Sequence, residues 1–124
     1  LPPNTPMGSL LVMDTGANGI VMGGAGLARV QSALTAFTPT PNKTLSSNGH
    51  ADKVIGTASV TISIRDSPSH QQLHLTNVLA TPSSRWNVAP PSHLPGFVSA
   101  TIAADGMMTI QLAGKAPLEA YNYN

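Results

Sequence analysis

Asp14 is the acidic residue whose surroundings point most clearly to chemistry. It directly follows the apolar run Leu10-Leu11-Val12-Met13, which predicts a short strand buried on both of its faces. A carboxylate at the end of such a strand needs a hydrogen bond, a partner charge or a proton, because burying it alone is costly. Thr15 supplies a hydroxyl beside it, Gly16 allows a close approach, and Ala17 keeps the neighbouring wall small. These residues form the candidate reactive site.

The remaining acidic residues lie in turns or polar stretches, where a solvated charge or a turn-former is the ordinary interpretation. They are Asp52, Asp66, Asp105 and Glu119.

Other kinds of reactive site find little support. His70 and His74 are four residues apart beside a strand pattern, a separation of about 13 Å that is too long for one shared metal ion. His93 is isolated, and we expect it at the surface or on a rim. The glycine-rich run 23–26 has Arg29 where a dinucleotide-binding motif needs a third glycine, and no second βαβ pattern follows. We therefore expect neither a metal nor a cofactor.

Composition limits the function further. The 124 residues suffice for one domain with its own core, so we expect a single domain over residues 1–124. The net charge is +1 and the six basic residues are scattered, which argues against a nucleic-acid surface. There is no cysteine and no apolar run near the roughly 18 residues of a membrane span. We expect a soluble, intracellular domain without membrane contact, whose termini, residues 1–8 and 118–124, are either loose or dimer-forming.

The elements that position Asp14 follow from periodicity. Apolar residues at helical spacing predict a short helix over 27–37, ended by Thr38-Pro39-Thr40-Pro41. Asn48-Gly49 indicates a two-residue turn. Beyond it, apolar residues at even positions from Val54 to Ile64 predict a half-buried strand, and Leu73, Leu75 and Leu79 a second one.

A last hairpin is expected between residues 98 and 112. Pairing Ile102 with Met108, Ala100 with Ile110 and Val98 with Leu112 places the apolar side chains on one face. This register needs a three-residue loop, 104–106, with Gly106 in the left-handed conformation. One short helix and many strands predict an all-β protein.

The order of these features resembles that of the retropepsin-like aspartic proteases, in particular the branch found in copia-type retrotransposons. The resemblance covers about residues 10–112. It rests on Asp14-Thr15-Gly16-Ala17 after an apolar strand, the stretch 54–60, the strand Leu75-Thr76-Asn77-Val78-Leu79 followed by Pro82, and the Asn87-Val88 pair. The family fold implied is a closed β-barrel or sandwich lobe with one or two short helices, active as a symmetric homodimer.

The resemblance also implies a mechanism. Aspartic proteases use two carboxylates that share one proton, and the chain carries a single Asp-Thr-Gly. Two chains would therefore each supply one Asp14 across a two-fold axis. Thr15 would brace the paired loops, while Gly16 and Ala17 would line the substrate cleft.

Substrate contacts are implied as well. Asn18 would contact the peptide, and Asn48, Gly49 and His50 would form a flap that closes over it, because they follow Asp14 at the separation seen in the family. The implied activity is endopeptidase cleavage of the element's own polyprotein, in the cytoplasm, either free or within virus-like particles. The partners would be a second copy of the chain and a peptide or polyprotein substrate.

Two departures from the family bear on function. Asn18 stands where retroviral relatives have a second aspartate, which puts the corresponding substrate contact in doubt. Ala89-Pro90-Pro91 permits only a very short helix after the Asn87-Val88 pair. The alternative hypothesis is a domesticated, catalytically silent relative that keeps the fold and binds a peptide or a protein.

Overall fold

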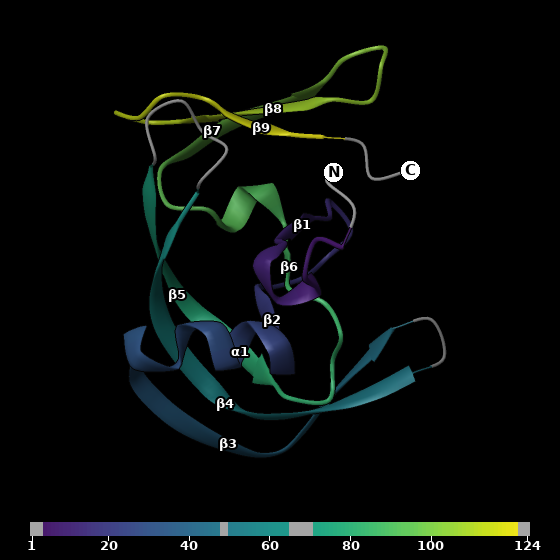
Figure 1. The fold of residues 1–124 in the computed structure, drawn as a ribbon, viewed down its shortest axis with the longest axis vertical. Coiled ribbons are helices and arrows are strands. Elements are labelled where there is room, and N and C mark those ends of the chain that lie inside the picture. Colours follow the sequence, from purple (N-terminus) through teal and green to yellow (C-terminus); the bar gives the residue numbers. More distant parts are fainter. Residues whose placement is uncertain (1–3, 48–49, 65–70, 122–124) are drawn as a thin grey trace.

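A computed structural model describes residues 4–47, 50–64 and 71–121. Most of these residues lie in strands, which confirms the all-β class (Figure 1). The strands are β1 Val12–Met13, β2 Val21–Gly23, β3 Leu34–Ser47, β4 His50–Ser63, β5 Gln72–Thr81, β6 Val88–Ala89, β7 Phe97–Ile102, β8 Met108–Leu112 and β9 Leu118–Ala120. The helical elements are α1 Gly24–Val30 and the short 3-10 turns η1 Met7–Ser9, η2 Gln31–Ala33 and η3 Pro91–His93.

The strands form two sheets. One has six strands in the order β1-β6-β2-β5-β4-β3, and the other has three in the order β7-β8-β9. Figure 1 shows the smaller sheet above the start of β5, with β1 and β6 below it, and one apolar core contains residues of both sheets. Over the described ranges both sheets are open, so the closed barrel expected from the resemblance is not found.

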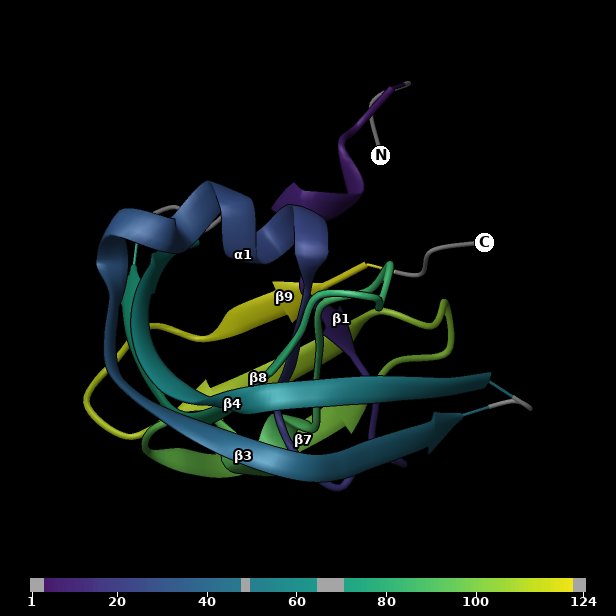
Figure 2. The ribbon, with the colours of Figure 1, turned by 90° about the horizontal axis from the view of Figure 1, so that it is seen from below.

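The strand β4 follows the predicted alternation. Its even positions Val54, Ala58 and Val60 are buried, while the odd positions between them are more exposed. Because β4 pairs with β3 on one side and β5 on the other, it is an inner strand of the large sheet, next to the outer strand β3. Figure 2 shows β3 and β4 curving together and extending beyond the rest of the molecule.

The strand β5 departs from simple alternation. Leu73 and Leu75 face the core, but Val78 rather than Asn77 continues that face. The pairing of β5 with β4 shifts register between Ala58 and Val60, and Asn77 has a φ of 53°. Asparagine tolerates this left-handed conformation, and the bulge reverses the faces of the residues that follow. Leu79 lies in this strand as predicted, but it is only half-buried, whereas Leu73 and Leu75 are buried.

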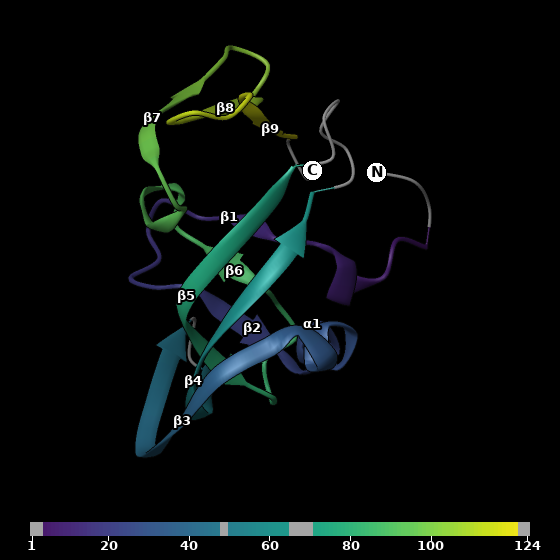
Figure 3. The ribbon, with the colours of Figure 1, turned by 90° about the vertical axis from the view of Figure 1, so that its left-hand side faces the viewer.

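The helix predicted over residues 27–37 is wrong in its second half. The α-helix ends at Val30 and β3 begins at Leu34, so Phe37 lies in a strand and is half exposed. Long-range pairing with β4 outweighs the local helical spacing, since β3 hydrogen-bonds along most of its length. Pro39 and Pro41 lie within β3, where prolines are tolerated because β3 is the outer strand of its sheet (Figure 3).

The β7–β8 hairpin confirms most of the predicted register. Ile102 pairs with Met108 and Ala100 with Ile110, and the Ala103 N–H donates to the Met107 carbonyl across a three-residue loop. Gly106 has a φ of 87°, as expected. The third predicted pair is wrong: a bulge lets Phe97 pair with Leu112 and leaves Val98 63% exposed.

Candidate active site

Asp14 lies on the connection between β1 and β2. These strands are consecutive in the chain, yet β6 lies between them, parallel to β1 and antiparallel to β2. The Val12 N–H donates to the Asn87 carbonyl at 2.8 Å, and the Asp14 N–H donates to the Ala89 carbonyl at 3.0 Å. The backbone of Asp14 is therefore fixed to β6, although the residue is exposed.

The Asp14 carboxylate is held by its own loop. The Gly16 N–H donates to Asp14 Oδ1 at 2.8 Å, and the Ala17 N–H donates to the Asp14 carbonyl at 3.1 Å. A Cβ at Gly16 would lie 3.3 Å from Asp14 Oδ1, a tight contact, so glycine suits this position. The loop presents a carboxylate with one oxygen oriented by a backbone donor.

The expected burial of this site is wrong for the single chain. Asp14, Thr15 and Gly16 are exposed, and Ala17 is half-buried. The strand before them is half-buried rather than buried on both faces, because Leu11 and Met13 pack against the core while Val12 does not. The strand leading to Asp14 thus has one face on the core and one face that is open.

Asn87 holds the surrounding segments together, a role that the sequence pattern did not indicate. Its side chain is 5% exposed; Oδ1 accepts from the Gly23 N–H at 3.0 Å, and Nδ2 donates to the carbonyls of Gly8 at 3.2 Å and Leu10 at 3.0 Å. A Cβ at Gly26 would collide with Asn87 Oδ1, so α1 packs closely on this amide. One buried side chain therefore joins the approach to β1, the end of β2 and the start of α1.

Replacing Asn87 by Ala should lower the free energy of unfolding by about 3 kcal/mol, because a buried N–H and two carbonyls lose their partner. Asn18 is exposed, so Asn18→Ala should change stability by less than about 0.5 kcal/mol. Urea denaturation of both variants measures the difference. If the two variants unfold at the same urea concentration, Asn87 does not stabilise this junction.

The structure describes the two strands, β3 and β4, of the hairpin that is expected to act as a flap. Ser47 at the end of β3 pairs with His50 at the start of β4. Asn48 and Gly49, which would form its tip, lie outside the described residues, so their assignment stays a prediction. His50 contributes its backbone to the pairing.

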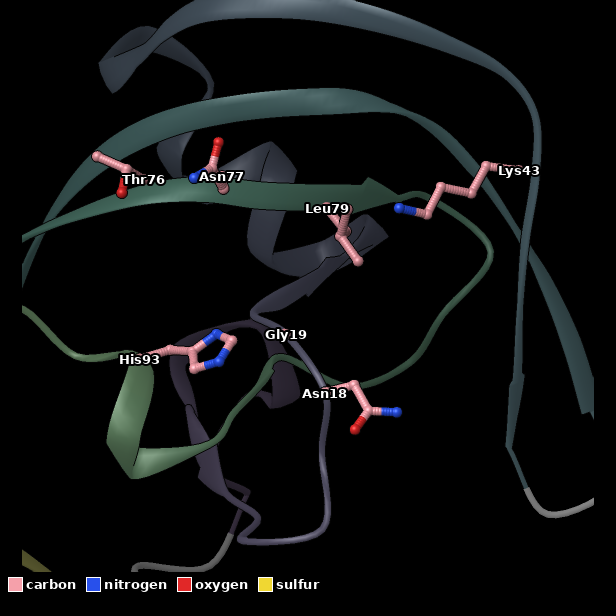
Figure 4. A pocket seen from close by; sticks show the side chains of 7 residues that line it. All are labelled: Asn18, Gly19, Lys43, Thr76, Asn77, Leu79 and His93. Atoms are coloured by element: carbon pink, nitrogen blue, oxygen red, sulfur yellow. The ribbon is translucent and has the colours of Figure 1, made fainter.

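A pocket opens beside the Asp14 loop, with a volume of about 370 Å³ (Figure 4). It is lined by Asn18, Gly19, Lys43, Thr76, Asn77, Leu79 and His93. These residues come from the loop after Asp14, from β3, from β5 and from η3, four segments that are distant in the sequence. Asn18, expected to contact substrate, is thus on the pocket wall, and His93 is on its rim as expected.

The bulge at Asn77 explains why the pocket exists. It turns Leu79 from the core face of β5 towards the pocket, where Figure 4 shows this side chain between Lys43 and His93. The position of His93 follows from Pro90 and Pro91, which limit η3 to three residues, as predicted. The sequence pattern did not single out Lys43, Thr76 or Leu79 as site residues, because only the tertiary fold brings them together.

The described residues contain no cluster of three or more His, Asp or Glu side chains placed to hold a metal ion. The ring of His74 is instead hydrogen-bonded to Thr61 Oγ1 at 3.0 Å across β4 and β5, and His70 lies outside the described ranges. Of the helices that the structure describes, none has the length and hydrophobicity to span a membrane.

The last described strand, β9, belongs to the smaller sheet. In β9, Leu118 pairs with Ile110, Glu119 with Thr109 and Ala120 with Met108, and the Leu118 side chain is buried. Residues 122–124 lie outside the described part. Among the described residues of this segment, Tyr121, which is 57% exposed, and the outer edge of β9 are available for a dimer contact, and the dimer-forming role stays a prediction.

No family model matches this chain, and comparison with curated proteins and with solved structures also finds no match. We therefore infer the function from the motif around Asp14 and from the geometry described above.

Proposed function

We propose that this chain is a homodimeric aspartic endopeptidase in which two copies of Asp14 form the catalytic pair. The Asp14 loop itself carries the proposal. Its carboxylate is exposed, one oxygen is oriented by the Gly16 N–H, and its backbone is fixed to β6. An exposed carboxylate held this firmly is suited to meet a symmetric copy of itself across a two-fold axis.

The described residues offer no second carboxylate beside Asp14, so the proposal takes it from another chain. Asp52 lies on β4 and accepts from Ser83 Oγ at 2.8 Å, Asp105 lies in the β7–β8 loop, and Glu119 lies on β9. None of these described carboxylates is on the Asp14 loop or among the residues that line the neighbouring pocket. Symmetry therefore supplies the simplest source of a pair.

The reaction needs two states of this pair. One Asp14 is ionised and takes a proton from a water molecule, while the oxygen of that water attacks the peptide carbonyl carbon. The other, protonated, gives its proton to the carbonyl oxygen, which yields a neutral tetrahedral intermediate. When the C–N bond breaks, a proton passes to the leaving nitrogen, and the products are a carboxylic acid and an amine.

The surroundings of Asp14 fit an extended peptide. The pocket lies on one side of its loop, and the long β3–β4 hairpin contributes Lys43 to the same pocket. A peptide lying across this surface would place its side chains in the pocket and its backbone beneath the hairpin. By the resemblance to the copia-type enzymes, the substrate is the polyprotein of a retrotransposon, cut in the cytoplasm or within virus-like particles.

The proposal is tested by incubating the protein at micromolar to millimolar concentration with a library of unstructured peptides and identifying new termini by mass spectrometry. We expect internal peptide bonds to be cut. A dimer that binds peptides in the same library but produces no new termini would instead support the silent, peptide-binding alternative.

A further inference from the structure

The pocket beside the Asp14 loop has an uneven distribution of charge. Lys43 is the one fully basic residue among those that line it, and no carboxylate is among them. Figure 4 shows the Lys43 side chain extending from β3 towards Leu79, while the His93 ring enters from the opposite side. Two residues that carry N–H donors therefore face each other across the space.

The position of Lys43 follows from the strand register. Lys43 pairs with Val54, which is fully buried, so both side chains lie on the inner face of the β3–β4 hairpin. Thr44 pairs with Lys53 on the opposite face, because successive strand residues alternate. The ammonium group of Lys43 is thus directed to the pocket side of the sheet by the backbone.

Within residues 4–47, 50–64 and 71–121, Lys43 has no partner of opposite charge. Among the described residues, no ion pair or hydrogen bond engages its ammonium group. Two of the described carboxylates have other hydrogen-bond partners: Asp52 accepts from Ser83 Oγ, and Asp14 Oδ1 accepts from the Gly16 N–H. A cationic pocket wall that has no partner in the described part of the chain is complementary to an anionic ligand group.

The other lining residues add neutral donors. Asn18 and Asn77 carry amide N–H groups, and Thr76 carries a hydroxyl. Leu79 supplies the one large apolar surface among the lining residues, suited to the methylene groups of a longer side chain. The volume of about 370 Å³ is within the usual range of ligand pockets and exceeds what one amino-acid side chain needs.

We propose that this pocket selects an acidic side chain, aspartate or glutamate, of the peptide substrate, with Lys43 as the specificity-determining residue. The inference rests on the proposed peptidase function. The pocket is close to the proposed catalytic residue, because Asn18 on the pocket wall follows Asp14 by four residues and so lies within about 14 Å of it. A basic side chain in the same place would meet Lys43 with like charge and be rejected.

The test compares the wild-type protein with Lys43→Met and Lys43→Glu in digests of the peptide library at one pH. In the wild type, Asp and Glu should be enriched at one defined distance from the cut bond, by roughly three- to tenfold for a solvent-accessible ion pair. Lys43→Met should remove the enrichment while neutral peptides are still cut. Lys43→Glu should shift the preference to Lys and Arg at the same distance.

Lys53→Met is the matched control, because Lys53 lies on the same hairpin and faces the other way. It should keep the wild-type preference. Cleavage without acidic enrichment in the wild type, or enrichment that survives Lys43→Met, would overturn the proposal while leaving the peptidase function intact.

A second measurement separates this proposal from the peptidase function. Two capped pentapeptides that differ only in Glu against Gln at the central position are titrated into ¹⁵N-labelled Asp14→Asn protein. The Glu peptide should bind roughly three- to tenfold more tightly and shift the amide signals of Asn18, Gly19 and Asn77. Equal binding of the two peptides would contradict acidic selection even in a protein that cuts nothing.

Discussion

Replacing Asp14 by Asn should reduce the rate of peptide cleavage by at least about 1000-fold, since the general acid and general base are then both lost. The change removes the ionisable group and keeps its shape. The asparagine side chain would still offer an oxygen to the Gly16 N–H, and the backbone bond from residue 14 to Ala89 is unaffected. Steady-state cleavage of the best library peptide measures the loss, and circular dichroism checks the fold.

Asp105→Asn is a closely matched control for this prediction. Asp105 also accepts the N–H of the residue two positions later, with Met107 N to Asp105 Oδ1 at 3.0 Å, so both substitutions alter the same kind of turn. Asp105 lies in the β7–β8 loop, outside the proposed site. Its variant should cleave at the wild-type rate. A loss shared equally by both variants would indicate damage to folding rather than to catalysis.

Mixing wild-type and Asp14→Asn chains should produce the second large effect. If each site takes one Asp14 from each of two chains, an equal mixture contains only about one quarter wild-type homodimers. Activity per wild-type chain should therefore fall to about half its value in the unmixed protein at the same total concentration. Dilution below the dimer dissociation constant should lower specific activity further.

The mixing experiment distinguishes a shared site from one that a single chain completes. Inactive chains would leave wild-type activity unchanged if each chain carried a whole catalyst.

The concentration dependence of activity can also locate the interface. Removing residues 121–124 keeps the β8–β9 pairing intact and deletes the exposed Tyr121. If this segment joins the two chains, the truncated protein should need a higher concentration for half-maximal activity.

Local pattern predicted those elements whose packing is regular. The apolar residues at even positions of 54–62 identified the inner face of β4, and the loop 104–106 with Gly106 set the β7–β8 register. The pattern failed where distant segments decide the conformation. Leu34–Phe37 has helical spacing but forms a strand because β4 pairs with it. Asn77 reverses the faces of β5 through a bulge that alternation alone cannot reveal.

The sequence pattern singled out Asp14 as the candidate reactive residue, but it did not reveal which residues surround it. Asp14 was marked by a carboxylate after an apolar run, although the single chain leaves it exposed rather than buried. Asn87 was visible in the sequence, but its three hydrogen bonds reach residues more than sixty positions away. Lys43 became relevant only once the strand register placed it on the inner face of the hairpin.

The most direct test of the proposed catalytic pair is the separation of the two Asp14 carboxylates in a crystal structure of the dimer formed in solution. We predict that they face each other across the two-fold axis at about 3 Å, close enough to share one proton. A dimer whose Asp14 carboxylates lie far apart, each open to solvent, would contradict the pair.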